Sequence, residues 1–169
     1  DGETAKGFGA FNGSQQSITR SALDLFSAVS NLTFQEVGGT GAAAADLRFA
    51  QSDLPSTAWA YFPTTDATGG DVWVNNSSRN YASPAKGNYA YLTIVHEIGH
   101  ALGLEHSSSS LADMYSAYNG RDTSLKSDDI NGIRAMYGGT RDPDRFDAAA
   151  SNGSCSAATN ISSQINTAA

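Results

Sequence analysis

All three histidines of this chain lie between positions 96 and 106, and this segment restricts the fold more than any other. His96 and His100 are four residues apart, so on a helix their side chains lie on one face and can reach the same cation. Apolar residues occupy most of the remaining helical surface, which predicts a buried helix with a single polar sector. Gly103 favours a left-handed turn that ends the helix and can bring His106 back to the other two histidines.

These residue types in this pattern indicate a catalytic zinc site. The neutral imidazoles of His96, His100 and His106 would leave a fourth tetrahedral position for water. Bound zinc lowers the pKa of that water to about 7 and polarises a carbonyl group beside it, and Glu97 can accept the water's proton as a general base. Two alternatives stay open, namely histidines without a metal and a structural zinc. A structural site usually has a fourth protein ligand, and the single cysteine, Cys155, is remote in sequence.

The full string of histidines, Glu97 and Gly103 resembles the catalytic domain of a metzincin zinc endopeptidase, with matrixin-like and some serralysin-like features. Met114, eight residues after the last histidine, is similar to the Met-turn of matrixins, which forms an apolar floor under the metal. The stretch Ser116, Ala117 and Tyr118 resembles the wall of the pocket for the residue after the scissile bond, with serine in place of the family's proline. The resemblance is strong over residues 58–138 and weaker before them.

Two tryptophans mark a departure from this resemblance. Residues 58–63 and 69–75 look like two matrixin strands, each of which normally carries a histidine ligand of a second, structural zinc. Trp59 and Trp73 stand in those places, and no histidine is left over, so we expect no second structural zinc. The resemblance also implies that an extended substrate adds antiparallel to an edge strand at Ala58, Trp59 and Ala60, a recognised mode of peptide binding.

The resemblance further implies a candidate calcium site. Asp46, the carbonyl groups of Ala67 and Gly69, and Asp71 match positions that hold a calcium ion in matrixins. Oxygen ligands from carboxylates and carbonyls suit calcium. A turn of small polar residues with solvated aspartates explains the same residues equally well.

The hydrophobic pattern and the resemblance together predict an α+β fold of the metzincin type. It would contain a twisted mixed sheet of five strands and three main helices, with the active-site helix followed by the Met-turn. Apolar residues recur at helical spacing over positions 18–32, with Ser14 or Ser17 as the N-cap. Strands are expected over residues 8–11, 32–37, 46–49, 59–62 and 72–75.

A last helix is predicted after the Met-turn. Ser127 can cap it, and Asp128 and Asp129 are placed favourably against the positive end of its dipole. The glycine pair at 138–139 would end it.

Length and composition predict one catalytic domain over residues 1–139 and a low-complexity C-terminal tail or linker over residues 140–169. The end of the tail is nearly all Ala, Ser, Asn and Thr, which can bury little apolar area. A net charge of −7 without a lysine or arginine cluster argues against a nucleic-acid groove. No apolar run is long enough to span a membrane, and we expect a monomer.

The resemblance implies a secreted zinc endopeptidase that hydrolyses extended protein substrates and prefers an apolar residue after the scissile bond. The absence of a signal peptide fits a mature form or a cytosolic protein, and the resemblance implies secretion. One alternative is a non-catalytic, metal-stabilised binding or adhesion module, which would have no need of Glu97 as a base. Another is a processing protease dedicated to one partner.

Overall fold

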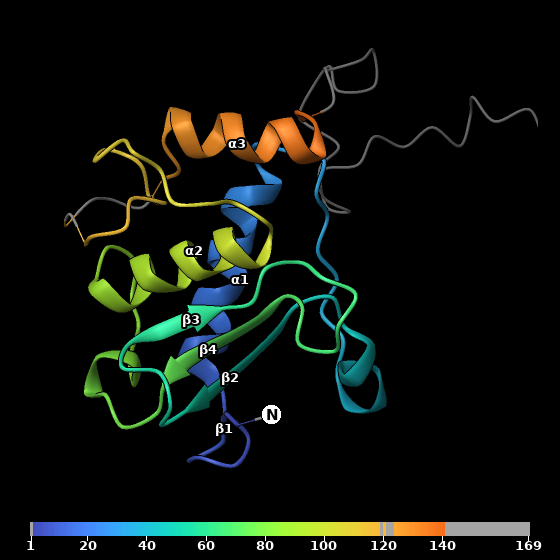
Figure 1. Ribbon diagram of the computed structural model, residues 1–169, viewed down its shortest axis with the longest axis vertical. Coiled ribbons are helices and arrows are strands. Elements are labelled where there is room, and N and C mark those ends of the chain that lie inside the picture. The colour runs from blue at the N-terminus through green and yellow to red at the C-terminus, as the bar shows by residue number, and fades with distance from the viewer. Residues whose placement is uncertain (1, 119, 121–123, 141–169) are drawn as a thin grey trace, which may run out of the picture.

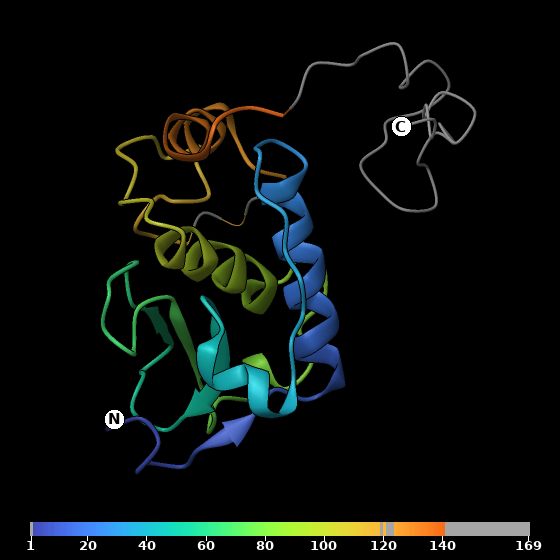
Figure 2. The same cartoon turned by 90° about the vertical axis from the view of Figure 1, so that its right-hand side faces the viewer.

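The computed structural model describes residues 2–118, 120 and 124–140, and within these residues a mixed sheet and three α-helices form the fold. In Figure 1 the sheet lies lowest, α2 crosses above it, and α3 lies on the far side of α2 from the sheet. Figure 2 shows α1 running beside α2, against which it packs. The elements are β1 (Gly9–Ala10), α1 (Gly13–Ser27), a 3₁₀ segment (Gly39–Ala44), β2 (Arg48–Ser52), β3 (Ala58–Ala60), β4 (Asp71–Asn75), a 3₁₀ turn (Arg79–Tyr81), α2 (Tyr89–Ala101) and α3 (Ser127–Tyr137).

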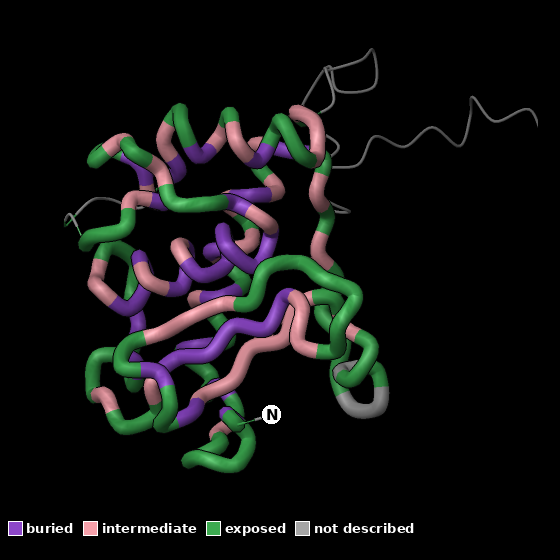
Figure 3. Tube along the Cα trace, in the orientation of Figure 1, coloured by how far each residue is buried: buried purple, intermediate pink, exposed green. Residues whose placement is uncertain are grey.

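The strand order of the sheet is β1-β2-β4-β3, so β3 is an edge strand beside the buried β4. The β2–β4 pair is parallel, whereas β1–β2 and β3–β4 are antiparallel. Figure 3 shows β4 as the buried centre of the sheet. Trp59 and Trp73 are register partners across β3 and β4, and side chains opposite each other in a ladder lie on the same face.

The prediction of five strands was wrong by one within the described residues. Residues 32–37 form no strand. Leu32 and Phe34 are partly buried against the core, as their alternation with polar residues predicted. The segment lies beside α1 instead, where the carboxylate of Glu36 accepts two hydrogen bonds from the guanidinium of Arg20. Alternation reports half-burial, but a strand also requires a neighbour with a free hydrogen-bonding edge.

The helix starts also differ from the predictions. The N-cap of α1 is Asn12, whose side chain accepts from the Gln15 N–H at 2.9 Å, while the Gln15 side chain accepts from the Asn12 N–H at 2.7 Å. This reciprocal capping box starts the helix upstream of Ser14 and Ser17, so neither is the cap. Ser127 is the first residue of α3 rather than its cap.

The core lies between α1, α2 and the sheet. Ala22 and Phe26 of α1, Ile94 and Ile98 of α2, and Val74 of β4 are fully buried in one cluster. Burial of a large apolar side chain stabilises a fold by about 1.5–3 kcal/mol. Helix α2 therefore packs against both α1 and the sheet.

The predicted tail lies outside the described residues apart from Thr140, and so does Cys155. Among the described residues, no helix has both the length and the apolar character that a membrane span requires.

Candidate active site

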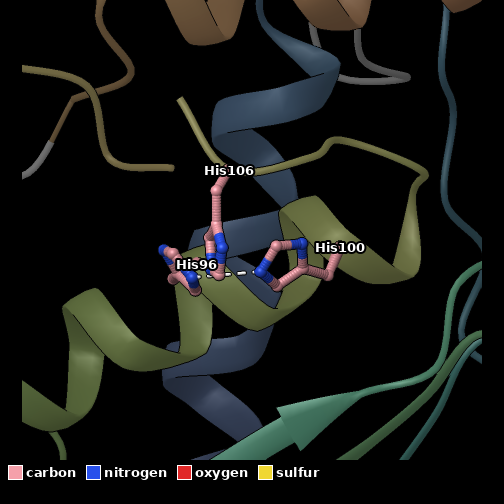
Figure 4. A group of neighbouring side chains, drawn as sticks. All are labelled: His96, His100 and His106. Atoms are coloured by element: carbon pink, nitrogen blue, oxygen red, sulfur yellow. Dashed lines mark hydrogen bonds between the residues drawn. The ribbon is translucent and has the colours of Figure 1, made fainter. Parts of the chain in front are cut away.

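Helix α2 and the turn after it bring the three histidines together. His96 and His100 lie on one face of α2, with their Nε2 atoms 3.1 Å apart. Gly103 adopts a positive φ of 101°, and the chain reverses there so that His106 returns to the pair (Figure 4). One ring nitrogen of each histidine lies within 4.8 Å of the others. A tetrahedral zinc with Zn–N distances of about 2.0–2.1 Å holds its nitrogen ligands about 3.3 Å apart, so the cluster fits such an ion.

Backbone carbonyl groups orient two of the imidazoles. The Nδ1 atom of His96 lies 2.8 Å from the carbonyl oxygen of Asp113, and that of His100 lies 2.7 Å from the carbonyl oxygen of Leu104. A carbonyl only accepts hydrogen bonds, so Nδ1 carries the proton and the Nε2 lone pair is available to a metal. Burial lowers the pKa of both His96 and His100, which favours the neutral ring that a metal requires.

Glu97 is buried beside this cluster. Its side chain lines the same pocket as His96, and the residue is only 8% exposed. Burial raises the pKa of Glu97 to about 7. A carboxyl group with such a pKa can both accept and return a proton near neutral pH.

The segment around Met114 lies against the active-site helix. Met114 is 2% exposed, and a Cβ atom added to Gly99 of α2 would lie 2.2 Å from its sulfur. The Met114 carbonyl accepts the N–H of Ser107 at 2.8 Å, which joins this turn to the residue after His106. Met114 therefore forms an apolar support for the helix between the two histidines that it carries.

A buried carboxylate from α3 holds this turn. Asp129 is 2% exposed and accepts the backbone N–H groups of Asp113 at 2.9 Å, Met114 at 3.0 Å and Lys126 at 3.0 Å. The carbonyl of the same Asp113 then accepts the proton on His96 Nδ1. Asp129 therefore helps to orient the His96 imidazole through the peptide unit between Asp113 and Met114.

A pocket of about 150 Å³ opens beside His96 and Glu97. The predicted wall residues Ser116, Ala117 and Tyr118 line one side of it, and residues of α2 line the other. The ring of Tyr118 packs edge-on against that of Tyr89, with centroids 5.0 Å apart. The full lining is Thr57, Tyr89, Leu92, Thr93, His96, Glu97, Asp113, Tyr115, Ser116, Ala117 and Tyr118.

The predicted substrate strand lies next to this pocket. Ala58, Trp59 and Ala60 form β3, which is the edge strand and packs against α2. Thr57, immediately before β3, is part of the pocket lining. The pocket therefore reaches from His96 to the residue that precedes the edge strand.

A family model described as matrixin matches residues 11–138. The chain belongs to the matrixin family. Serralysin A of Dickeya chrysanthemi is 37% identical over 112 residues, which are 63% of this chain and 23% of that protein. Matrix metalloproteinase-27 of Homo sapiens is 40% identical over 81 residues, which are 46% of this chain and 16% of that protein. The chain thus spans less than a quarter of the length of these relatives.

In this matrixin chain, Gly99 is a packing requirement of the site, and we expect Gly99→Ala to be destabilising. The added methyl group meets the buried sulfur of Met114, and overpacking of this kind costs about 1–3 kcal/mol, more than the helix propensity gained. Urea unfolding measures the loss of stability, and the amount of zinc bound per chain measures the effect on the site. Gly13→Ala at the start of α1 is the matched control, because a Cβ there meets nothing within 4 Å. Equal stability of the two variants would contradict the packing role of Gly99.

The residues predicted for calcium are arranged differently from a metal cage. Asp71 is buried, and its carboxylate binds the guanidinium of Arg48, which also donates to the carbonyl of Ala67. The N–H of Gly69 donates to the carbonyl of Asp66. Asp46 is exposed. The calcium site stays a prediction.

Sequence patterns did not reveal three parts of this site. The acceptors for His96 and His100 are backbone carbonyls, which leave no mark in the residue types. The sequence predicted Asp129 only as a residue in the first turn of the last helix. That position does not tell whether its carboxylate is buried or exposed. Arg48 carried no signal beyond its place at the start of a strand.

Proposed function

We propose that this matrixin domain is a zinc-dependent endopeptidase. His96, His100 and His106 would hold the ion through their Nε2 atoms, and bound zinc would supply an activated water and polarise the scissile carbonyl. The observation that carries the proposal is the convergence of three imidazoles beside a buried glutamate in an open pocket. Metal-stabilised binding modules need the imidazoles but have no use for the glutamate.

Glu97 would act as the general base and acid. It would accept the proton of the attacking water and deliver it to the leaving amine, and a pKa of about 7 suits both steps. All of these groups come from one chain, so a monomer suffices for the reaction.

An extended substrate would pair antiparallel with β3. Main-chain hydrogen bonds to this edge strand would place the scissile carbonyl near the histidine cluster. The next side chain would then enter the pocket between α2 and residues 116–118. Leu92 and the rings of Tyr89 and Tyr118 line this pocket, which supports a preference for a medium-sized apolar residue after the scissile bond.

We also propose that the catalytic unit covers residues 1–139 and works outside the cell. The end of α3 at Tyr137 and the end of the family match at residue 138 support this boundary. The resemblance to metzincin endopeptidases supports secretion.

A paired measurement tests this function. Elemental analysis is expected to find about one zinc per chain, and a quenched peptide library is expected to be cleaved mainly before apolar residues. Removal of zinc by a chelator should abolish cleavage, and added zinc should restore it. Bound zinc without cleavage of any peptide would favour a binding module. Cleavage of one sequence alone would favour a dedicated processing protease.

A further inference from the structure

An arginine side chain lies among the oxygen atoms at the start of the parallel β2–β4 pair. Arg48 and Asp71 are register partners there. The Arg48 Nε atom donates to Asp71 Oδ1 at 2.7 Å, and Nη2 donates to Oδ2 at 2.8 Å. The Asp71 side chain is 6% exposed and that of Arg48 is 31% exposed. This is a bidentate, largely buried pair, the strongest geometry for a guanidinium and a carboxylate.

The same guanidinium also binds the loop that joins β3 to β4. Its Nη2 atom donates to the carbonyl of Ala67 in the middle of this loop. The ends of the loop are joined by backbone hydrogen bonds, from the Tyr61 N–H to the Asp71 carbonyl at 2.9 Å and from the Gly70 N–H to the Tyr61 carbonyl at 3.2 Å. Arg48 therefore links the loop interior to the buried carboxylate at its end.

These contacts do not fit a calcium ion at the predicted place. Calcium takes six to eight oxygen ligands at about 2.3–2.6 Å. Both Asp71 oxygens and the Ala67 carbonyl already accept from Arg48, so a calcium ion there would compete for their lone pairs and meet a like charge. Arg48 and a metal ion would therefore be alternative partners for the carboxylate of Asp71 and the carbonyl of Ala67.

We propose that the guanidinium of Arg48 is the internal cation of this loop and holds the loop to the start of the β2–β4 pair in place of calcium. The fold around Asp71 is then independent of calcium. Removal of the guanidinium leaves a buried carboxylate and a carbonyl without their partner, and a metal cation can satisfy them.

The consequence reaches the substrate strand. Residues 61–70 connect β3 to β4, and β3 is the edge on which a peptide would lie. Because the guanidinium of Arg48 is bound to this loop permanently, it keeps the β3 edge ordered at any calcium concentration. Arg48 would hold this loop whether or not the domain cleaves peptides.

The test compares zinc-loaded wild type, Arg48→Gln and Arg20→Gln in calcium chloride and in magnesium chloride of equal ionic strength. Thermal unfolding measures stability, and aromatic-sensitised terbium luminescence measures binding at the loop. Arg20→Gln is the matched control, because it removes an equally bidentate arginine–carboxylate pair whose side chains are 51% and 65% exposed.

For wild type, the melting temperature in calcium chloride should equal that in magnesium chloride. The same should hold for Arg20→Gln. Arg48→Gln should melt roughly 5–10 °C lower in magnesium, because it leaves a buried carboxylate unpaired, and should regain about half of that loss in calcium. Terbium luminescence that calcium displaces should appear in Arg48→Gln and be absent from wild type.

A rise in the wild-type melting temperature with calcium would overturn the proposal, and this measurement does not depend on how well any variant folds. Wild-type stability in Arg48→Gln would also overturn it. So would a destabilised Arg48→Gln that neither recovers in calcium nor binds terbium, because Arg48 would then be an ordinary ion-pair partner.

Discussion

Glu97→Gln is expected to keep its zinc and to lose peptide cleavage by about two to four orders of magnitude, the usual contribution of a positioned general base. The amide is nearly the same size as the carboxyl group, but it cannot accept the water's proton. The three histidines and the carbonyl acceptors of His96 and His100 are unchanged, so metal affinity should stay close to that of wild type. Initial rates on one optimised peptide, together with zinc analysis, measure both effects.

Glu105→Gln is the control for this substitution. Glu105 is also adjacent in the chain to a histidine ligand, but it is exposed and does not line the pocket beside His96. Its variant should cleave within about two-fold of wild type, as a surface change far from proton transfer should. Equal losses in the two variants, or full activity of Glu97→Gln, would contradict the role given to Glu97.

Asp129→Asn is expected to destabilise the fold by roughly 2–4 kcal/mol and to weaken zinc binding by about 10–100-fold. Its carboxylate accepts three backbone N–H groups inside the protein, and the amide nitrogen of asparagine would face donors with a donor. The turn that carries the Asp113 carbonyl would loosen, and His96 would lose part of its orientation. Urea unfolding and competition with a zinc chelator measure the two effects separately.

The neighbouring residue supplies the control for this prediction. Asp128 is exposed and its carboxylate accepts one hydrogen bond from the Ser107 hydroxyl, at 2.5 Å. Asp128→Asn makes the same chemical change one position earlier on α3 and should alter stability by less than about 1 kcal/mol. Equal stability and equal zinc affinity of Asp128→Asn and Asp129→Asn would contradict the role of Asp129 in holding the site.

Short-range features of the site were predictable from the sequence because their geometry is set within one or two helical turns. The four-residue spacing of His96 and His100 places them on one face of any helix, and the positive φ of Gly103 was predicted and is confirmed. The matrixin membership predicted from the same string is confirmed by the family match.

Features that depend on distant partners were predicted poorly. Residues 32–37 have the alternation of a strand, but the sheet has no place for them and Glu36 pairs with α1 instead. The N-cap of α1 was misplaced for a local reason, because Ser14 and Asn12 are both good caps and the reciprocal bond between Asn12 and Gln15, three residues apart, decides between them.

The residue string from 96 to 106 was therefore sufficient to predict a three-histidine cluster and the helix that carries it, because these depend on local spacing. Tertiary structure was needed to identify Asp129 as the clamp on the Met114 turn, the carbonyls that orient the imidazoles, and Arg48 as the partner of Asp71. The contacts of Asp129 with the Met114 turn, of His96 with Asp113 and of Arg48 with Asp71 join residues 15 to 23 positions apart. The acceptors of the two imidazoles are backbone atoms, which every residue type carries. Residue types alone do not encode which of many such groups will meet, since that depends on how the helices and the sheet pack.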